Sequence, residues 1–375
     1  MQKKSIAIIR QNYTPYGGAE KFIERIINTM SSMEVSVTMI TRVWHKSKDH
    51  KVIRCNPFYF GRTWRDYGFE RCVCRALKSA KFDIVQSHTR VGCCDVHRAG
   101  DGLHKVWLEQ RARVRSKIGK FLTSISMYHR YILDAEKRLY NNPELKAVIC
   151  NSEMVKNEIL ENFTIASEKL HVIYSAVDKE LFSLRLSKIY RRQIRVDLCI
   201  PEADFVFLFV GSGFERKGLG AAIKAIAQIN GCVHLLVVGH DGKQRKYQKL
   251  ADMLGVNDLV YFIGPKKDVR PYYGAADSFV FPTLYDPFPN VALEAFASGL
   301  PVITSKKSGA AELIDDGENG YVIDAFDVQG LAAAMRKVMK EECYSLMKEK
   351  ARNTIEYLTW DHMMDNYLRL YEKIL

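Results

Sequence analysis

Two carboxylates lie eight positions apart in TLYDPFPNVALEAFASGLPVIT, residues 283–304. Asp286 precedes two prolines, which disfavour helical backbone in the residues before them. Asn290 is a favourable N-cap for a helix of about two turns that contains Glu294 and ends near Gly299. The free amides at a helix start can bind an anion, and a carboxylate beside a nucleotide commonly binds the ribose diol. The alternative is an acid placed where the helix dipole favours it.

A glycine-rich turn with adjacent cations follows an apolar run in FVFLFVGSGFERKGLGAAIKAI, residues 205–226. Gly211 and Gly213 would let the backbone approach a ligand closely. Arg216 beside Lys217 at a helix start suits a diphosphate. The spacing is not that of a dinucleotide fingerprint, and no P-loop sequence occurs in the chain. An ordinary strand-to-helix turn with two solvated cations is the alternative.

Two further stretches follow apolar runs of the first half. In NYTPYGGAEKF, Gly17 and Gly18 could admit a phosphate or sugar against bare backbone, or form a flexible turn before the next helix. His88 and Asp101 both follow the run FDIVQ closely enough to face one ligand site. A lone histidine is more often structural, and an aspartate between two glycines is more often a turn residue.

Residues 103–140 hold nine Lys and Arg against three acids, and they predict a basic amphipathic helix. Its apolar stripe comprises Val114, Ile118, Phe121, Leu122, Ile125 and Ile132, and the basic residues largely off that stripe are Arg111, Arg113, Arg115, Lys117 and Lys120. This pattern is typical of a helix that lies on an anionic membrane surface. A core-packed helix with a solvated basic face is the alternative. A nucleic-acid groove is disfavoured, because no aromatic-interleaved platform accompanies the charge.

The composition bounds the class of protein. A chain of 375 residues with 47% hydrophobic and 26% charged residues is expected to form two domains of a soluble protein. Residues 1–175 hold 30 Lys and Arg against 17 acids and residues 176–375 hold 26 against 26, so the whole excess of +13 lies in the first half. That half is expected to face something anionic.

The cysteine pattern and the hydropathy point to the cytoplasm. No apolar run approaches the 18 or more residues that span a bilayer, and the run IAII is too short for a signal peptide. The nine cysteines are odd in number and contain no C-x-x-C, so neither a disulfide framework nor a zinc site is expected. Reduced thiols are the prediction.

Apolar runs alternate with helical patterns along the whole chain, which predicts an α/β fold with parallel sheets. Ligands in such folds bind at the carboxyl ends of the strands. We expect an N-terminal domain over 1–182, a linker over 183–204, a second domain over 205–358, and a helix over 359–375 that packs back toward the first domain. The strands are expected at 5–10, 35–41, 82–88, 146–152, 205–211, 234–239, 259–264, 278–282 and 301–305.

The succession of motifs resembles a known family. GGAE, QSH, VGSGFERKG and TLYDPFPNVALEAFASGLPVIT occur in the order found in retaining glycosyltransferases of the GT-B fold, and the likeness covers nearly the whole chain. RAGDGLHKVWLEQR with GSGFERKG is similar to bacterial enzymes of lipopolysaccharide inner-core assembly, the heptosyl glucosyltransferase and its galacturonosyltransferase relatives. The resemblance implies two Rossmann-like domains that face a central cleft.

The resemblance also assigns roles to residues. Glu294 would hold the ribose of the donor, and Asp286 with nearby backbone amides would hold the donor sugar and phosphates. Arg216 and Lys217 would neutralise the leaving diphosphate, and His88 would contact the sugar. The full donor-binding set is Gly17, Gly18, Gly211, Gly213, Arg216, Lys217, Asp286, Asn290, Val291, Ala292 and Glu294, and the catalytic set is Asp286, Arg216, Lys217, His88 and Asp101.

Three positions depart from the family pattern. Asp286 stands where many members have Glu, Pro289 where Gly is usual, and Ser212 where an Arg often follows the glycine. The shorter carboxylate changes the reach toward the sugar, and the proline removes an N–H donor. These departures leave the identity of the donor sugar open.

The resemblance implies a hexosyltransferase that moves glucose or galacturonate from a UDP-sugar to a heptose of the lipopolysaccharide inner core. No D-x-D sequence occurs, so no metal and no cofactor are expected. The enzyme would be cytoplasmic and peripheral on the inner face of the cytoplasmic membrane, with Arg111, Arg113, Arg115, Lys117 and Lys120 facing membrane or acceptor, and without a nucleic-acid partner. The alternatives are transfer to another cell-surface polysaccharide or glycolipid, and a non-enzymatic module that binds anionic membrane or nucleic acid.

Overall fold

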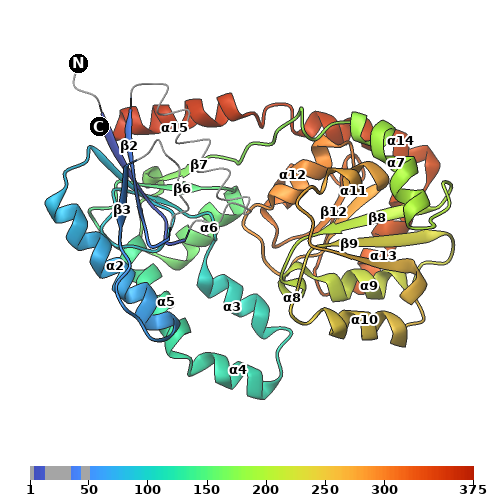
Figure 1. The fold of residues 1–375 in the computed structure, drawn as a ribbon, viewed down its shortest axis with the longest axis horizontal. Helices are drawn as coiled ribbons and strands as arrows, with labels where there is room; N and C mark the ends of the chain where they lie inside the picture. The colour runs from blue at the N-terminus through green and yellow to red at the C-terminus, as the bar shows by residue number, and fades with distance from the viewer. Residues whose placement is uncertain (1–3, 13–34, 44–50) are drawn as a thin grey trace. The chain divides into compact units, whose positions relative to one another are not determined.

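The computed structural model describes residues 4–12, 35–43 and 51–375, and the chain forms two compact units (Figure 1). Unit 1 comprises Met1–Ile173 and Met364–Leu375, and unit 2 comprises Tyr174–Met363. The unit boundary follows the last strand of unit 1 rather than residue 182. The predicted glycines Gly17 and Gly18 lie outside the described residues.

The sheet of unit 1 sets the position of the loops that could bind a ligand. Its described strands are β1 (Ser5–Ile9), β2 (Ser36–Thr41), β3 (Lys51–Arg54), β4 (Ile84–Ser87), β5 (Val96–Arg98), β6 (Ala147–Cys150) and β7 (Leu170–Val172). In this described part the strands pair in parallel in the order β3-β2-β1-β4-β5-β6-β7. Strands β2 and β3 extend the sheet on one side of β1, and strands β4 to β7 extend it on the other side. The topological switch point therefore lies between β1 and β4.

The described helices of unit 1 are α2 (Gly61–Ser79), α3 (His104–Ala112), α4 (Lys117–Ser124), α5 (Met127–Tyr140), α6 (Glu153–Asn162) and α15 (Trp360–Ile374), with a 3₁₀ turn at Ser167–Lys169. Helix α15 contributes its residues from Met364 onward to this unit. Helix α2 lies against α5, and the Tyr131 hydroxyl of α5 donates a hydrogen bond of 3.0 Å to Glu70 of α2. Residues of both helices line a cavity together with residues that follow β1 and β4.

Residues 103–140 form three helices, so the prediction of one long amphipathic helix is wrong. The break has a local cause, because two serines act as N-caps within the stretch. The Ser116 hydroxyl accepts a hydrogen bond from the Gly119 amide at the start of α4, and the Ser126 hydroxyl accepts one from the His129 amide at the start of α5. An N-cap residue has extended backbone, so each cap ends the preceding helix.

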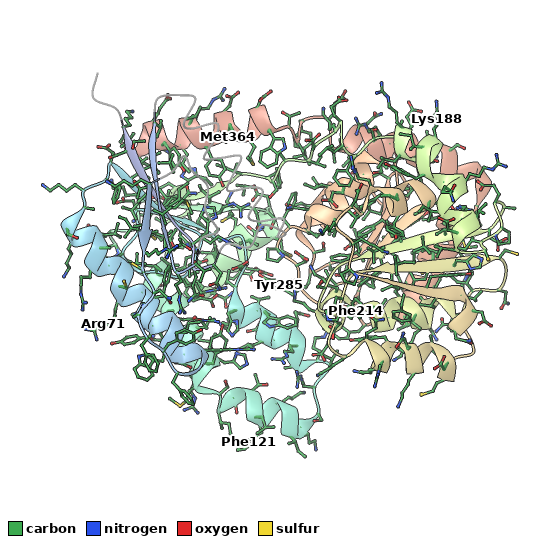
Figure 2. All side chains as sticks on the ribbon, in the orientation of Figure 1. Arg71, Phe121, Lys188, Phe214, Tyr285 and Met364 are labelled. Atoms are coloured by element: carbon green, nitrogen blue, oxygen red, sulfur yellow. A yellow bond between two sulfur atoms is a disulfide. The ribbon has the colours of Figure 1, made fainter. Side chains whose placement is uncertain are left out.

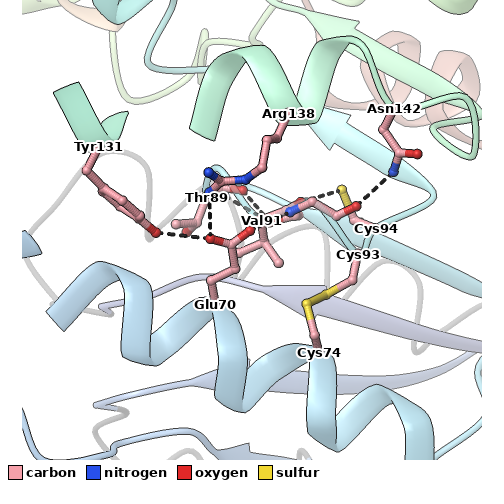
Figure 3. Close-up of a disulfide and its surroundings, with 11 residues drawn as sticks. Glu70, Cys74, Thr89, Val91, Cys93, Cys94, Tyr131, Arg138 and Asn142 are labelled. Carbon is pink, nitrogen blue, oxygen red and sulfur yellow. Dashed lines mark hydrogen bonds and ion pairs between the residues drawn. A yellow bond between two sulfur atoms is a disulfide. The ribbon is translucent and has the colours of Figure 1, made fainter. Parts of the chain in front are cut away.

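One pair of cysteines contradicts the prediction of reduced thiols. Cys74 of α2 and Cys93 of the loop after β4 form a disulfide, with their Cα atoms 5.8 Å apart (Figure 3). Both residues pack against an apolar cluster around Phe69 and Val73, which brings together two positions that are 19 residues apart in sequence. The other described cysteines whose side chains are placed are free thiols, namely Cys55, Cys72, Cys94, Cys150, Cys199 and Cys232.

Unit 2 has a second parallel sheet. In its described part the strand order is β10-β9-β8-β11-β12-β13. The strands are β8 (Phe205–Val210), β9 (Val233–Val238), β10 (Val260–Gly264), β11 (Ser278–Phe281), β12 (Val302–Ser305) and β13 (Gly320–Ile323). The central runs FVFLFV and VHLLVV are buried almost throughout, as expected for strands covered on both faces. The predicted α/β fold with two parallel sheets is confirmed.

The helices of unit 2 are α7 (Arg185–Asp197), α8 (Phe214–Lys217), α9 (Leu219–Ile226), α10 (Gln244–Met253), α11 (Arg270–Ala275), α12 (Asn290–Ala297), α13 (Val328–Val338) and α14 (Glu341–Thr354), with 3₁₀ turns at Asn257–Leu259 and Gly309–Leu313. Helix α7 occupies the segment 183–204, where the sequence predicts a linker. It packs against α11, and its Arg195, only 1% exposed, pairs with Asp277 at 2.7 Å. Arg195 and Asp277 are 82 residues apart in the chain, so the local pattern does not reveal this pair.

Candidate functional site

The switch point of the unit 2 sheet lies between β8 and β11, and the segments that leave these two strands are bonded together. The Leu284 amide donates to the Arg216 carbonyl at 2.7 Å, and the Thr283 hydroxyl donates to the same carbonyl at 2.9 Å. The turn after β8 and the loop after β11 therefore form one surface. The two sequence stretches that were predicted to bind a diphosphate meet here.

Glycine is required where these two segments touch. A Cβ atom on Gly218 would lie 1.9 Å from the Pro282 carbonyl oxygen, and the residue has φ +79°. Gly213 has φ +76°, a conformation that side-chain-bearing residues rarely adopt. Sequence reasoning selected Gly211 and Gly213 and missed Gly218, although the run GLG was a visible signal.

Asp286 is the centre of the charged group at this site. It is 6% exposed, and its Oδ2 accepts a hydrogen bond from Lys217 Nζ, with Arg216 Nη1 3.8 Å away. The Arg216 guanidinium also donates to the Tyr285 carbonyl at 3.1 Å. Lys217 stands over the ring of Phe281 at 4.8 Å. Two cations therefore share one buried carboxylate, so the group carries an excess of one positive charge.

Burial sets the protonation behaviour of Lys217. Its pKa is lowered mainly by burial and further by the Arg216 guanidinium, whereas Asp286 opposes this shift. A buried ammonium of this kind gains from any additional anion that approaches it, because the surroundings screen the interaction poorly. The group is suited to receive the negative oxygens of a phosphate.

Helix α12 begins after the proline-rich loop, but not at the predicted cap. Pro289 occupies the N-cap position with φ −74° and ψ 114°, and Asn290 is the first helical residue without a side-chain cap bond. The prediction that Asn290 is the N-cap is wrong by one position, because the proline already supplies the extended backbone that a cap needs. The Ala292 amide donates to the Pro289 carbonyl at 3.0 Å. The amides of Asn290 and Val291 have no carbonyl of a preceding helical turn to bind.

Glu294 lies one turn into α12 and is held by a tyrosine that sequence reasoning missed. The Tyr273 hydroxyl of α11 donates to Glu294 Oε2 at 2.8 Å and lies 3.1 Å from the Val291 carbonyl oxygen. Burial, and then the Glu294 charge, raise the pKa of Tyr273 well above its usual value, so the hydroxyl remains a donor. No motif marks this tyrosine, which is 21 residues from its partner.

Unit 1 has a cavity of about 420 Å³ at its own switch point, at the carboxyl ends of β1 and β4. His88 and Asp101, which the sequence predicts to face one ligand site, both line it. The other lining residues are Arg10, Gln11, Asn12, Arg65, Asp66, Phe69, Thr89, Arg90, Val91, Tyr128, Tyr131 and Ile132. The residues from α2 and α5 were not anticipated, because their helices reach the cavity only through tertiary packing.

The wall of this cavity on α2 carries a hydrogen-bonded group of polar side chains. Asp66 Oδ1 accepts from Gln11 Nε2 at 2.8 Å and from Arg65 Nε at 2.7 Å. Aromatic rings of Tyr128 and Tyr131 stand on the side of α5. Planar polar groups beside aromatic rings offer donors, acceptors and apolar faces, the combination that a polyhydroxylated ring requires.

His88 is buried in this wall and is neutral. Burial is the main cause that lowers its pKa well below the usual value, followed by the charges of Arg98, Arg10 and His97. A neutral imidazole has one donor and one acceptor nitrogen. The side chain therefore contributes a hydrogen bond rather than a charge to the cavity.

The basic stretch of unit 1 presents an apolar surface on and around α4. Ile118 is 73% exposed and Phe121 63%, and Phe121 is labelled in Figure 2. Val114, Leu122, Ile125 and Met127 are exposed as well, whereas Ile132 is buried, so the predicted stripe holds for all its members except the last. Lys117 and Lys120 are exposed beside these side chains. We call the exposed set Val114, Ile118, Phe121, Leu122, Ile125 and Met127 the α4 surface.

The basic residues of this stretch differ in their surroundings, and Lys120 lines the same pocket as two of the arginines. Arg111 stacks on Trp107 at 5.9 Å, and Arg111 and Arg115 line an apolar pocket of about 300 Å³ between α3, α4 and α5. Arg113 is exposed. Within the described residues, no helix is long and apolar enough to cross a bilayer.

Comparisons with known proteins cover both units. The family described as "Glycosyl transferases group 1" matches residues 191–358, and "Glycosyltransferase Family 4" matches residues 16–181. The crystal structure of WaaG, a glycosyltransferase involved in lipopolysaccharide biosynthesis, covers 98% of this chain and 99% of its own, with a TM-score of 0.82 and 24% identity. The chain belongs to the GT-B glycosyltransferases.

Curated relatives of this transferase include two enzymes of lipopolysaccharide synthesis. Lipopolysaccharide glucosyltransferase WaaG of Escherichia coli is 25% identical over 90% of both chains. The lipopolysaccharide core biosynthesis glycosyltransferase LpsE of Rhizobium meliloti is 34% identical, but the match spans only 52% of LpsE and 47% of this chain. Among solved structures, HepE of Anabaena in complex with UDP and glucose has a TM-score of 0.72 at 19% identity, over 99% of each chain.

Proposed function

We propose that this transferase moves a hexose or hexuronate, glucose or galacturonate, from a UDP-sugar to a heptose of the lipopolysaccharide core, with retention of configuration. Transfer to another cell-surface glycan remains the alternative within the same activity. The names of WaaG and LpsE support the lipopolysaccharide acceptor, and the UDP complex of HepE supports the donor. The assignment to glucose or galacturonate rests on the motif resemblance.

The observation that carries the proposal is the charged group of Arg216, Lys217 and Asp286 at the switch point of unit 2. Sugar transfer breaks the bond between the anomeric carbon and the diphosphate, so negative charge grows on the leaving oxygens. The two cations on α8 and the free amides at the start of α12 can stabilise that charge. Both helices follow strands of the unit 2 sheet. Lys217 and Arg216 can bind the diphosphate while Asp286 keeps their side chains in place.

The nucleoside is assigned to α12. Glu294, oriented by Tyr273, can accept two hydrogen bonds from the vicinal hydroxyls of a ribose, since an ionised carboxylate only accepts. The cavity of unit 1 is assigned to the sugars, with His88 as a contact of the transferred sugar and Asp101 as an acceptor for hydroxyl groups. We assign no enzymic nucleophile.

A UDP-release assay on the full chain tests the donor and the reaction. We expect release of UDP with UDP-glucose or UDP-galacturonate in the presence of a heptose-containing core acceptor, and no release with UDP-N-acetylglucosamine. Because we assign no metal to the site, the rate is expected to persist in EDTA. The Lys217→Met variant serves as the inactive control. A chain that binds anionic vesicles yet releases no UDP from any donor would favour the non-enzymatic module, and a rate abolished by EDTA would overturn the metal-independent mechanism.

We propose further that the transferase docks on the inner face of the cytoplasmic membrane through the α4 surface. Six exposed apolar side chains beside two exposed lysines support this proposal, because helices that lie in the membrane interface have this amphipathic pattern. The lysines would face the anionic headgroups while the apolar side chains enter the acyl boundary. This arrangement would bring a lipid-linked acceptor within reach of the enzyme.

Vesicle co-sedimentation tests the docking surface. Replacing Lys117 and Lys120 with glutamine should weaken binding to phosphatidylglycerol-containing vesicles by about 30-fold, at about 1 kcal/mol for each lysine. Phe121→Ser should weaken binding to the same vesicles without changing its salt dependence. The matched control replaces Lys243 and Lys249, two exposed lysines of unit 2, with glutamine. If all these variants bound the vesicles as tightly as the wild type, α4 would be a solvated helix with no role at the membrane.

A further inference from the structure

A group of exposed aromatic side chains lies at the start of α2, outside the cavity and outside the α4 surface. Phe58 is 80% exposed, Phe60 83% and Trp64 50%. The ring of Phe58 stands edge-on to that of Trp64, with the ring centroids 5.9 Å apart. Large apolar side chains that gather on an exposed surface mark a place where a partner or a membrane binds. We call Phe58, Phe60 and Trp64 the α2 aromatic surface.

The exposed face of α2 beside these rings is basic. The exposed residues that follow Trp64 at the spacing of one helical face are Tyr67, Arg71, Arg75 and Lys78. The two acids of α2 point elsewhere, because Asp66 lines the cavity of unit 1 and Glu70 accepts a hydrogen bond of 3.0 Å from Tyr131 of α5. The charged side chains on the exposed face are therefore all cations, so this face complements an anionic surface.

Helix α5 links the α2 aromatic surface to the α4 surface. It packs against α2 and against α4 (Figure 1). Tyr67, one turn after Trp64, stands edge-on to Tyr131 of α5 with the ring centroids 6.4 Å apart. Met127, the first residue of α5, is 76% exposed and belongs to the α4 surface. Both exposed surfaces therefore adjoin the first two turns of α5.

The cavity of unit 1 takes lining residues from the same two places. On α2, Arg65 and Asp66 directly follow Trp64, and on α5, Tyr128 directly follows Met127. A lipid leaflet that contacts both surfaces would therefore lie next to the cavity. An acceptor whose lipid stays in that leaflet could reach the cavity without leaving the membrane.

The composition of the α2 aromatic surface favours a bilayer over a sugar chain as its occupant. Phe58 and Phe60 offer no hydrogen bond to a hydroxyl group, whereas a sugar site needs polar groups placed beside its aromatic rings. The interface of a bilayer accepts phenyl rings in its apolar part and the indole N–H of Trp64 at the headgroups. An anionic leaflet also attracts the cations that follow on the same face of α2.

We propose that the α2 aromatic surface is a second membrane-contact site, which enters the same anionic leaflet as the α4 surface. The rings of Phe58, Phe60 and Trp64 pass between the headgroups, and Arg71 and Arg75 stay among the lipid phosphates. Two contacts on one compact unit bind the leaflet together, so the loss of either weakens the attachment of the whole chain. The contact follows from exposure and charge alone, whereas its use in presenting a lipid-linked acceptor rests on the proposed function.

Tryptophan fluorescence of the full chain on phosphatidylglycerol vesicles measures the insertion without an activity assay. Phospholipids brominated near the headgroup end of their acyl chains should quench part of the emission. Trp64→Phe keeps an apolar ring at this place, so it should still bind the vesicles, and it should lack the quenched part of the emission that Trp64 supplies. If the wild type and Trp64→Phe lost the same amount of emission to the brominated lipid, Trp64 would lie outside the leaflet and the proposal would be overturned.

Co-sedimentation with the same vesicles measures the contribution to binding. The double variant Phe58→Ser, Phe60→Ser should bind about 30-fold more weakly, the effect of withdrawing two partly buried phenyl rings from an apolar medium. The matched control is Ile189→Ser, Val196→Ser, which removes two exposed apolar side chains of α7 in unit 2 and should bind as the wild type does. An equal loss in both double variants would show a general effect of surface hydrophobicity and would overturn the proposal.

The cations of α2 are tested by varying the lipid. Arg71→Gln, Arg75→Gln should weaken binding to phosphatidylglycerol vesicles by about 30-fold and leave the weak binding to phosphatidylcholine vesicles unchanged. Equal binding of this variant and the wild type to phosphatidylglycerol at low salt would contradict the orientation in which this face of α2 meets the headgroups.

Other occupants of the α2 aromatic surface would give other results with Phe58→Ser, Phe60→Ser. Loss of a self-association that the wild type shows in sedimentation velocity would make the surface an interface between copies of the chain. Weaker binding of a lipid-free core oligosaccharide would make it a sugar subsite. Either result would overturn the membrane contact.

The transfer assay separates this proposal from the proposed function. In Phe58→Ser, Phe60→Ser we expect transfer to a vesicle-borne acceptor to fall with the binding, and transfer to a lipid-free acceptor to keep the wild-type rate. If transfer to both acceptors fell equally, the surface would act on the site itself rather than through the membrane. Failure of the transferase assignment would appear as absence of UDP release by the wild type with either acceptor, while the quenching and co-sedimentation results would stand.

Discussion

Replacing Lys217 with methionine lowers kcat by about 10²- to 10³-fold, the range observed when one preorganised group that stabilises developing charge is removed. The variant keeps the length of the side chain and its contact with Phe281 and removes only the ammonium. Because the lost interaction is strongest with the leaving diphosphate, kcat should fall far more than the affinity for the donor. Steady-state kinetics with calorimetric titration of UDP measures both quantities.

Two controls distinguish catalysis from folding in this experiment. Among the residues that the structure describes, Lys217→Met leaves the buried Asp286 with only Arg216 as an ionic partner, so it should also lower the free energy of unfolding. The double variant Lys217→Met, Asp286→Asn has no unpaired carboxylate and should regain stability without regaining activity. Lys224→Ala, an exposed lysine of α9, should retain the wild-type rate. A full rate in Lys217→Met would remove the diphosphate assignment.

Replacing Asp277 with alanine lowers the free energy of unfolding of unit 2 by about 3–5 kcal/mol, because it leaves a buried guanidinium uncompensated. The carboxylate lies 2.7 Å from both Arg191 and Arg195 and also accepts from the Val206 amide at 2.8 Å. Arg195 of α7 is almost fully buried, so water cannot replace the lost carboxylate as the partner of its guanidinium. Urea denaturation followed by circular dichroism measures the change.

The matched control is Asp268→Ala. Asp268 pairs with Arg270 at 2.7 Å, but both side chains are more than one-third exposed, so the loss should be below about 1 kcal/mol. Asp277→Asn keeps the volume and one acceptor oxygen and should fall between these two variants. If Asp277→Ala and Asp268→Ala were equally stable, the buried anchor of α7 would have no part in the stability of unit 2.

Five of the six described strands of unit 2, all except β13, and the charged residues beside them were accessible from sequence because their signals are local. Long apolar runs bounded by glycine predict β8 and β9 at nearly their observed positions. The cations at 216 and 217 and the acid at 286 stand next to strand ends, and parallel strands gather their carboxyl ends at one edge. The N-cap of α12 was misplaced by one residue, since asparagine is a favoured cap but the preceding proline already has the extended backbone of that position.

What the sequence could not provide depends on side chains that meet across long separations. Tyr273 beside Glu294, Cys74 beside Cys93, and Tyr371 beside Gln86 have no motif that links them. Each pair forms only after helices have packed on a sheet, because a hydrogen bond or disulfide depends on distance in space and not on spacing in the chain.

The amino-acid sequence by itself determined the parallel α/β layers, the resemblance to the family and the charged turn after β8, because periodicity and glycine content act over a few residues. Only the tertiary structure decided that α7 stands where a linker was expected and that Tyr371 of the last helix bonds Gln86, whereas two serine caps divide residues 103–140 locally. The contacts of α7 and of the last helix join residues far apart in the chain, so packing rather than the local pattern chooses their partners.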